Sequence, residues 1–374
     1  MNLKVQDVQV DLFGNSTFSK IQTEGIKYAG SKLKLIRYIL ESIEGLGIKN
    51  VLDGFSGTTR VSQAFAKAQY NTAANDISYW SETFAKCFLL AKKENSYYQK
   101  LILHLNNVSP VNGWFTEHYG GGIKFSEKRP FQIKNTQKLD GIREEIDTLK
   151  LDEIDKSVAL TSLILALDKV DSTMGHYVSY LNKWSPRSFN HLHLKVPNIV
   201  TSKGNHSVFR GDIFETLENQ EFDLCYFDPP YGSNNEKMPP SRVRYASYYH
   251  IWTSIIKNDK PQLFGKANRR IDTKDSVSCS IFEEFRKDAD GNFIAMKAIE
   301  RMIRQAKAKY ILLSYSSGGR ATKKELLDIL NCSGKLLKCL EIDYKRNVMA
   351  SMRWTNEWVK SDNKHKEYLF LIEK

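Results

Sequence analysis

Buried strands alternate with amphipathic helices along this chain, and that alternation restricts its fold more than any other feature. An apolar strand is expected at Lys49–Phe55, followed by a helix at Arg60–Ala68 and a short strand at Asn71–Asp76. The pattern resumes with strands at Ser207–Asp212 and Phe222–Phe227, the second of which is closed by two prolines. The order of these elements is typical of an α/β protein.

The last part of the chain continues the same pattern. A long helix is expected at Ala295–Ala308, a strand at Lys309–Tyr315, a helix at Thr322–Leu330 and a final strand at Glu367–Glu373. No internal repeat with a period of about 20 to 50 residues interrupts this pattern, which disfavours a solenoid or a propeller. The elements together predict a mostly parallel sheet with helices on both faces.

A long segment without strand–helix alternation separates the two parts. Between Asp76 and Asp212 the sequence carries helical stretches together with loop-like text that is rich in glycine and aromatic residues. An inserted subdomain accounts for this change of character. We therefore predict one domain from residues 20–94 and 207–374, with residues 95–206 as an inserted, mainly helical subdomain.

The metal-binding and redox residue types form no recognisable set. His191 and His193 alternate as on a strand, but no carboxylate or cysteine completes a ligand set, so we expect no metal site. The five cysteines contain no CxxC pair, which predicts a reduced, cytoplasmic protein. The sequence also lacks a long apolar run and a leader with the layout of a signal peptide, so neither secretion nor a membrane span is expected.

The chain is basic, with 55 lysines and arginines against 43 aspartates and glutamates and a net charge of +12. A balance of this sign favours a polyanionic partner such as nucleic acid.

The sharpest local signal is the tetrad Asp228-Pro229-Pro230-Tyr231 at the carboxyl end of a buried strand, where open α/β sheets bind ligands. Two prolines remove two backbone donors, so the turn presents carbonyl oxygens and one carboxylate, all of them acceptors. An aromatic ring follows directly. Such a site suits a planar group that carries an amine, with Asp228 and the Pro229 carbonyl accepting its N–H bonds and Tyr231 stacking on its face.

The tetrad, in the context FDPPYG, resembles the catalytic motif of the amino-methyltransferases that methylate the exocyclic amine of adenine. IKYAGSKLKLIRYIL (residues 26–40) is similar to the family's first cofactor motif, and VLDGFSGTTRVSQAFA (residues 51–66) to its glycine loop, although Thr59 stands where a glycine is usual. Asp76 and Asp212 match two further acidic positions. Five motifs in one order identify the chain as similar to the Dam-like alpha group, with a Rossmann-like methyltransferase sheet and a target-recognition insert.

The resemblance implies S-adenosylmethionine as the cofactor. The glycine loop would approach its methionine end, Asp76 would accept hydrogen bonds from its ribose, and Asp212 would lie near its adenine. Lys32 and Tyr28 would hold the other side of the cofactor. The full predicted set of cofactor-binding residues is Tyr28, Ala29, Gly30, Lys32, Asp53, Phe55, Ser56, Gly57, Asp76, Ile77, Asp212 and Ile213.

The implied reaction is direct methyl transfer to adenine in duplex DNA, after the base has rotated out of the stack. The resemblance also implies that methylation is site-specific. A restriction endonuclease that acts separately is an expected functional partner, and duplex DNA is the expected substrate. Two alternatives stay open: an RNA adenine methyltransferase, and a catalytically silent DNA-binding protein on the same scaffold. The long insert favours DNA over RNA, because reading a DNA sequence needs a separate surface.

The excess positive charge lies after the tetrad. Residues 207–231 hold 1 basic and 6 acidic residues, whereas residues 232–374 hold 28 and 17. We therefore predict that basic residues of this flank contact DNA phosphates and position the duplex without reading its bases. The predicted contacts are Arg242, Arg244, Lys266, Arg269 and Arg270.

Overall fold

A computed structural model gives the fold of the protein. It describes Phe18 and residues 21–122, 129–232, 244–274, 277, 280–344 and 365–374. One predicted DNA contact, Arg242, lies outside the described residues.

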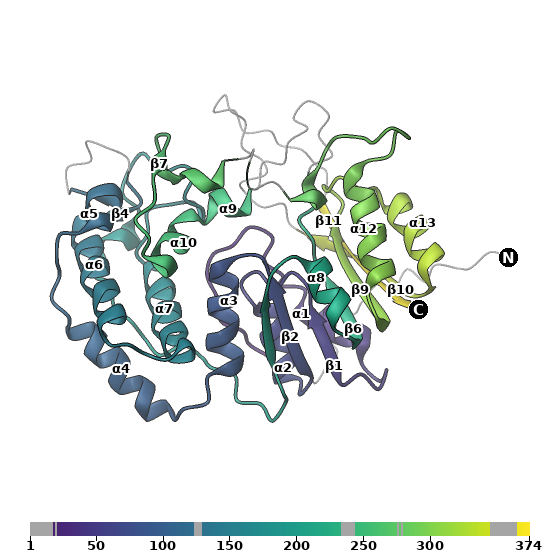
Figure 1. The fold of residues 1–374 in the computed structure, drawn as a ribbon, viewed down its shortest axis with the longest axis horizontal. Coiled ribbons are helices and arrows are strands. Elements are labelled where there is room, and N and C mark those ends of the chain that lie inside the picture. The colour runs from purple at the N-terminus through teal and green to yellow at the C-terminus, as the bar shows by residue number, and fades with distance from the viewer. Residues whose placement is uncertain are drawn as a thin grey trace.

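A seven-stranded sheet forms the centre of the molecule, with the strand order β10-β11-β9-β6-β1-β2-β5 (Figure 1). The pairs of β1 with β2, β1 with β6, β2 with β5 and β6 with β9 are parallel, and β11 runs antiparallel to both β9 and β10. The strands are β1 (Asn50–Asp53), β2 (Asn71–Asp76), β5 (Ser207–Arg210), β6 (Phe222–Phe227), β9 (Ala308–Ser316), β10 (Lys335–Tyr344) and β11 (His365–Glu373).

Helices cover both faces of this sheet because its central strands are apolar on both sides. Leu52, Cys225 and Ile311, which are in register, face α8 (Ile213–Asn219), α12 (Ile294–Gln305) and α13 (Lys323–Ser333). Their neighbours Val51, Leu224 and Tyr310 face α1 (Ile36–Ile43) and α2 (Arg60–Lys67) on the other side. Alternate residues of a strand point to opposite faces, so a continuous apolar run requires two covering layers.

The predicted α/β fold with a mostly parallel sheet and helices on both faces is confirmed. The expected strand at Asn71–Asp76 and the expected strand at Phe222–Phe227 have the same bounds in the structure. Strand β10 had no clear sequence signal. It is a half-exposed edge strand, and an irregularity between Leu336 and Lys338 breaks the two-residue period by which strands are recognised.

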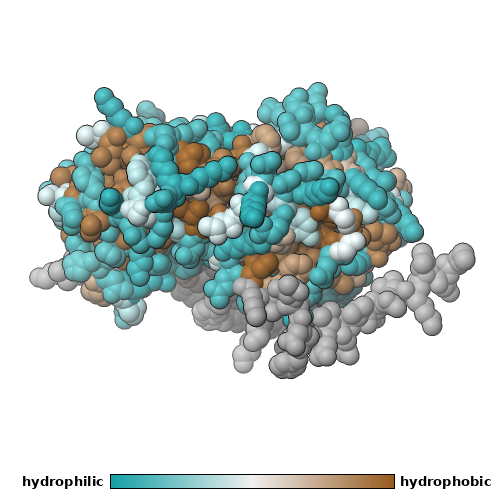
Figure 2. All heavy atoms as spheres, turned by 90° about the horizontal axis from the view of Figure 1, so that it is seen from below, coloured by the Kyte–Doolittle hydropathy of each residue, from teal (hydrophilic) through white to brown (hydrophobic). Residues whose placement is uncertain are grey.

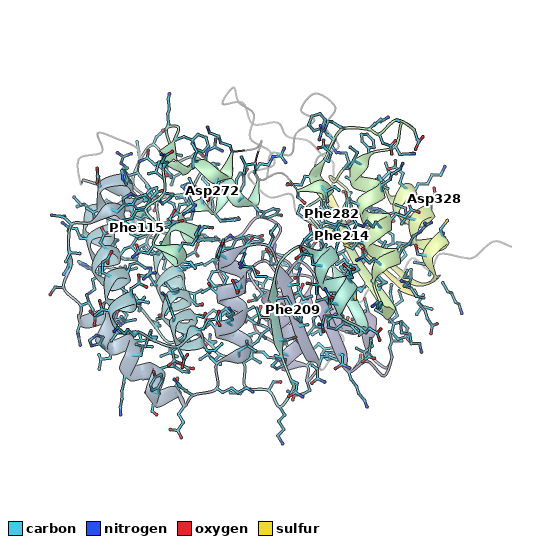
Figure 3. The ribbon with its side chains drawn as sticks, viewed as in Figure 1. Phe115, Phe209, Phe214, Asp272, Phe282 and Asp328 are labelled. Carbon is cyan, nitrogen blue, oxygen red and sulfur yellow. The ribbon has the colours of Figure 1, made fainter. Side chains whose placement is uncertain are left out.

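A second, helical lobe lies beside the sheet, at the left in Figure 1. Its helices are α4 (Asn95–Asn107), α5 (Trp114–Tyr119), α6 (Ile133–Thr148), α7 (Glu153–Leu167) and α10 (His250–Lys257). They share one hydrophobic core with α3 (Tyr79–Ala85), and Figure 3 shows Phe115 inside this lobe. Residues 95–206 therefore stay our proposed insert, and α10 packs with them although it comes later in the chain.

Buried polar contacts join α10 to the insert as well. Arg143 of α6 is 1% exposed and donates from Nε to the carbonyl of Ile255 at 2.6 Å and from Nη2 to that of Ile256 at 3.3 Å. These two carbonyls belong to the last turn of α10, where backbone acceptors have no partner inside the helix.

The face seen from below in Figure 2 is mostly hydrophilic, with hydrophobic residues scattered over it.

Candidate active site

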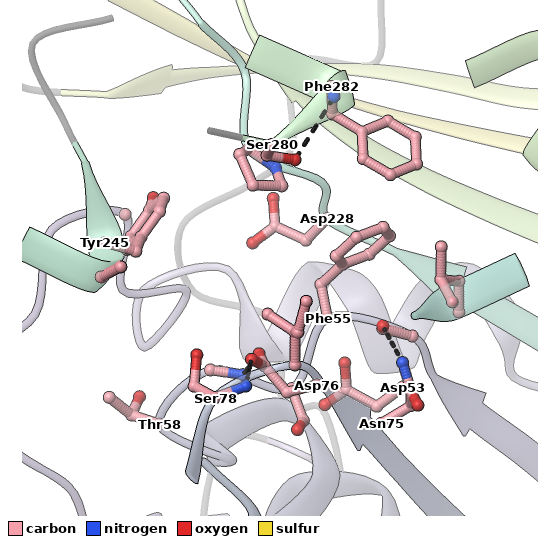
Figure 4. Close-up of a pocket in the computed structure, with 18 of the residues that line it drawn as sticks. Asp53, Phe55, Thr58, Asn75, Asp76, Ser78, Asp228, Tyr245, Ser280 and Phe282 are labelled. Carbon is pink, nitrogen blue, oxygen red and sulfur yellow. Dashed lines mark hydrogen bonds between the residues drawn. The ribbon is translucent and has the colours of Figure 1, made fainter. Parts of the chain in front are cut away.

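A cavity of about 700 Å³ opens at the carboxyl ends of β1, β2 and β6. Parallel strands end at the same edge of a sheet, so the residues that follow these three strands meet there. Figure 4 shows the carboxylate of Asp228 pointing into this cavity, with Tyr245 on one side and Asp53 and Asp76 beneath. Three carboxylates from three adjacent strand ends thus surround one space.

The carboxylate of Asp53, at the end of β1, is 1% exposed and only half satisfied. Its Oδ2 accepts a hydrogen bond from Ser62 Oγ at 2.5 Å, while its Oδ1 has no hydrogen-bond partner within the described residues. Burial, opposed by the Ser62 bond, raises the pKa of Asp53 to about 7. An open acceptor at the cavity wall is a feature that a ligand with N–H or O–H groups can satisfy.

The loop after β1 has a backbone that only small or strained residues allow. A Cβ on Gly54 would lie 2.8 Å from the Phe227 ring, and Gly57 has a φ of +48°. Thr59, the non-glycine residue of the motif, adopts a φ of 60° and a ψ of 14° at the start of α2. It keeps the left-handed conformation for which glycine is normally used, so the loop retains its shape at a cost in backbone strain.

Asp76, at the end of β2, accepts backbone hydrogen bonds at both carboxylate oxygens. Gly57 N–H donates to Oδ2 and Ser78 N–H donates to Oδ1, each at 2.9 Å. Burial raises the pKa of Asp76, and these donors oppose the rise. The next residue, Ile77, is 71% exposed and lines the cavity, which provides an apolar surface beside the carboxylate.

Asp212 and Ile213 form the beginning of α8. Asp212 caps this helix by accepting a hydrogen bond from Phe214 N–H at 2.9 Å, and it lines the cavity. Ile213 is 3% exposed and belongs to the core between α8 and the sheet. Phe214 and Phe282 stack with their ring centroids 5.9 Å apart, and Figure 3 places them side by side near α8.

The carboxylate of Asp228 is held at one oxygen. Lys32 Nζ lies 3.0 Å from Oδ1, and the hydroxyl of Tyr231 donates to the same atom. No described residue donates to Oδ2. Burial raises the pKa of Asp228, and the Lys32 ammonium opposes the rise.

Tyr231 does not line the cavity, although its hydroxyl reaches Asp228. Its ring packs against Tyr315 at 4.6 Å between centroids, and its carbonyl accepts hydrogen bonds from the Arg320 N–H at 2.7 Å and the Tyr315 hydroxyl at 3.1 Å. The aromatic ring that faces Asp228 across the cavity is Tyr245 of α9 (Tyr245–Tyr248). The stacking role predicted for Tyr231 has a second aromatic candidate in this ring, which sequence reasoning missed.

Tyr245 belongs to an aromatic wall that continues into the helical lobe. Its ring stacks on Tyr28 at 5.3 Å, Tyr28 stacks on Tyr249 at 4.8 Å, and Tyr249 stacks on Trp252 at 4.4 Å. Gly30, with a φ of +80°, leaves room for the Tyr245 hydroxyl, which would lie 3.0 Å from a Cβ at that position. The sequence signal that could have found Tyr245 is the aromatic-rich segment YASYYHIWTSI (residues 245–255) to which it belongs.

Most of the predicted site residues meet in this cavity. Of the predicted catalytic and cofactor-binding residues, Ala29, Pro229 and Tyr231 do not line it, and Ala29 N–H donates to the Tyr249 hydroxyl at 2.7 Å. The predicted residues that line it are Tyr28, Gly30, Lys32, Asp53, Phe55, Ser56, Gly57, Asp76, Ile77, Asp212, Ile213, Asp228 and Pro230.

The predicted phosphate contacts differ in their access to solvent. Lys266 is exposed in the turn between β7 (Leu263–Phe264) and β8 (Arg269–Arg270), and Arg269 is half-buried over the Phe264 ring. Arg244 is 11% exposed and lies 3.4 Å from a carboxylate oxygen of Glu283.

Among the predicted phosphate contacts that the structure describes, Arg270 is the least accessible to a phosphate. Its side chain is 2% exposed and lies between the carboxylates of Asp259 and Asp272, at 2.6 and 2.8 Å. This geometry counts against a phosphate contact by Arg270, because the buried guanidinium already has two anionic partners.

Within the described part of the chain, His, Cys, Asp and Glu side chains form no group of three that could hold a metal ion. The helices of this part also include none that is long and apolar enough to cross a membrane.

Comparison with known families gives the site its context. The model of the D12 class N6 adenine-specific DNA methyltransferases matches residues 28–317, which include all of the strand ends described above. The chain belongs to this family. The prediction of a DNA adenine methyltransferase is thereby confirmed at the level of the family, in preference to an RNA enzyme.

Relatives of the chain are methyltransferases of type II systems. It is 27% identical over 360 residues to the type II methyltransferase M.NlaIII of Neisseria lactamica, covering 93% of this chain and 99% of that protein. It is also 27% identical over 372 residues to M.FokI of Planomicrobium okeanokoites, covering 93% of this chain but 53% of the relative. The chain thus spans about half the length of one relative and nearly all of the other.

The half-satisfied carboxylate of Asp53 predicts a pH-dependent stability. Its folded pKa of about 7 exceeds the unfolded value near 4, so the stability that it contributes is complete below about pH 4 and is lost as the pH rises through 7. Asp53→Asn removes the ionisation. The free energy of unfolding of the variant minus that of the wild type should therefore be about 2–3 kcal/mol larger at pH 8 than at pH 5.

Urea denaturation at the two pH values, without any added ligand, measures this gain. Asp328→Asn is the matched control, because Asp328 is exposed on α13 and does not line the cavity; Figure 3 labels it. The control should differ from the wild type equally at both pH values. An Asp53→Asn variant that does the same would show that this carboxylate is ionised without penalty in the folded protein.

Proposed function

We propose that this protein transfers a methyl group from S-adenosylmethionine to the exocyclic amine of adenine in duplex DNA, at a specific site. One observation carries the proposal. The carboxylate of Asp228 points into the cavity with its donors on Oδ1, so that Oδ2 is left to accept an N–H bond from a ligand. Family membership indicates the substrate class, adenine in DNA. The open acceptor Oδ2 indicates how the amine of that base would be bound.

The residues present fit S-adenosylmethionine. This molecule carries a positive sulfonium, an ammonium group and ribose hydroxyls, and the carboxylates that line the cavity, among them those of Asp53, Asp76 and Asp228, suit such a ligand. The open Oδ1 of Asp53 suits an ammonium donor, and the carboxylate of Asp76 suits the hydroxyls. Ile77 gives an apolar surface for a purine ring, beside Asp212 at the beginning of α8.

The glycine loop contributes shape. Because Gly54 and Gly57 have no side chain, the backbone can approach a ligand closely, while Phe55 lines the cavity above it. Phe55 is itself held in an edge contact with Phe282 at 5.2 Å between centroids. The loop would therefore bind and orient the cofactor, and the rest of the cavity wall would exclude water.

The substrate end of the cavity would act on the amine of adenine. S-adenosylmethionine, when bound, supplies an electrophilic methyl group. The adenine amine is a poor nucleophile because its lone pair is delocalised into the ring, and hydrogen bonds to Asp228 Oδ2 and to the Pro229 carbonyl favour the pyramidal geometry that makes the pair available. Orientation and electrostatics of these acceptors are the protein's contribution to the step.

A flipped adenine needs a stacking surface to offset the loss of its place in the duplex, which costs about a few kcal/mol. Tyr231 remains a proposed part of the base site, and its hydroxyl also fixes Oδ1 of Asp228. Tyr245 has the more open position, since its ring lines the cavity opposite Asp228. We propose Tyr245 as the main stacking platform.

Duplex DNA would lie over the mouth of the cavity, and Lys266 and Arg269 are the proposed phosphate contacts. A separately acting restriction endonuclease is proposed as a functional partner, because the relatives are named as methyltransferases of type II systems.

Methyl transfer by the purified protein tests the proposed function directly. With tritiated S-adenosylmethionine we expect label in unmethylated duplex DNA and in adenine, and none in RNA of the same sequence. Label in RNA alone, or in no nucleic acid, would contradict the proposal. Digestion to nucleosides and chromatography identify the methylated base.

Asp228 should be essential for transfer and dispensable for cofactor binding. Asp228→Ala removes the acceptor, and we expect kcat to fall by about 10²–10³ or more, as when a positioned electrostatic group is deleted. The dissociation constant for S-adenosylmethionine, measured by calorimetry, should change little. The matched control is Asp223→Asn at the other end of β6, where the carboxylate accepts from the backbone of Lys49 and Asn50. Equal kcat values for the two variants would remove Asp228 from the mechanism.

Lys266 and Arg269 should determine part of the salt dependence of DNA binding. Replacing both by alanine should reduce the slope of log K against log[salt] by about 0.9 for each lost phosphate contact. Filter binding across a salt series measures the slope. Arg304→Ala, at an exposed position of α12, is the control and should leave it unchanged. A double variant with the wild-type slope would place the DNA elsewhere.

A further inference from the structure

A buried glutamate close to the catalytic tetrad has no explanation in the fold. Glu367 lies near the beginning of β11, and Leu369 and Leu371, which point to the same side of this strand, belong to the apolar core against α1. Glu367 is 8% exposed, and its Oε2 has no hydrogen-bond partner within the described residues. A carboxylate in such surroundings costs stability unless a charge is near.

The charge near Glu367 is the ammonium of Lys32. Its Nζ lies 3.8 Å from Glu367 Oε2 and 3.0 Å from Asp228 Oδ1, and the Lys32 side chain is 5% exposed. One buried cation is thus shared by two carboxylates from different strands. Tyr231 joins the group, because its hydroxyl donates to Asp228 and its ring lies 4.9 Å from Nζ.

The position of the cation decides which oxygen of Asp228 is open. With Glu367 Oε2 also within 3.8 Å, the ammonium of Lys32 contacts Asp228 at Oδ1, and the attraction of the second carboxylate holds it in that place. Without that second attraction, the ammonium would be free to centre on Asp228 and to cover Oδ2 as well. It would then compete with the adenine amine for the acceptor.

We propose that Glu367 is a positioning residue for methyl transfer, acting through Lys32 to keep Asp228 Oδ2 open. The proposal rests on the function proposed above. It gives a buried carboxylate among core residues a reason, because Lys32 already has Asp228 as a partner at 3.0 Å and would not be left as an unpaired buried charge without Glu367. The sequence gives no hint of this role, because Glu367 belongs to none of the methyltransferase motifs.

A change of charge at Glu367 also affects the ionisation of Asp228. Removing one negative charge nearby should let Asp228 keep its carboxylate to lower pH. The groups that face Asp228 are Lys32 before α1, Asp53 of β1, Tyr226 of β6, Tyr231, Tyr28, Tyr245 of α9 and Glu367 of β11. Apart from Lys32, every group in this set is a carboxyl or a tyrosine.

The test is Glu367→Gln, which keeps the shape and removes the charge. We expect kcat for DNA methylation to fall about tenfold, KM for S-adenosylmethionine to stay within about twofold, and the acidic limb of the kcat–pH profile to move to lower pH. The melting temperature should be unchanged or higher. Glu367→Asp, which restores the charge at shorter reach, should recover part of the lost kcat.

Glu341→Gln is the matched control. Glu341 lies on the neighbouring strand β10 and pairs with Lys323 and Lys366 at the surface. It should leave kcat and the pH profile unchanged.

Two outcomes would overturn the positioning role: a Glu367→Gln variant with wild-type kcat and pH profile, or one that loses activity and melting temperature together without a shift of the acidic limb. An inactive wild-type protein would instead contradict the proposed function, so the two failures are distinguishable.

Discussion

Parallel pairing of β1 between β2 and β6 is the constraint on which the site depends. It brings Asp53, Asp76 and Asp228 to one edge of the sheet, although the last lies far from the others in sequence. Like charges in a partly buried space repel one another, which is one cause of the raised pKa of Asp53. The arrangement is tolerable because backbone N–H groups hold Asp76 and an ammonium holds Asp228.

The same cavity is closed on one side by the helical lobe. Tyr28, from the segment before α1, stacks between Tyr245 and Tyr249, and Tyr249 continues the stack to Trp252 in the lobe's core. Large aromatic faces contribute both burial and a fixed geometry. Packed aromatic rings therefore connect the cavity with the core of the helical lobe.

Charge is distributed in opposite senses between the pocket and the rest of the chain. The protein carries +12 overall, yet the residues that line the cavity include six with a carboxyl group and three that are basic, namely Lys32, Arg60 and Arg301. A basic surface suits DNA, and an acidic pocket suits a cationic cofactor and an amine. Within the basic flank itself the roles divide, because Arg270 stabilises its own loop through Asp259 and Asp272, whereas Lys266 remains in solvent.

The sequence by itself determined the fold class and pointed to Asp53, Asp76 and Asp228 as residues that meet at one edge of the sheet. Periodicity and the proline-closed strand predict the sheet, and each strand end marks a candidate residue, because local pattern and strand direction suffice for that. Which side chains touch was decided only by the tertiary structure. The structure places Lys32 3.0 Å from Asp228 and packs the ring of Tyr231 on Tyr315. It also brings Glu367, which had no sequence signal, to 3.8 Å from Lys32. Such contacts join residues from distant strands, and their geometry depends on packing that no local pattern records.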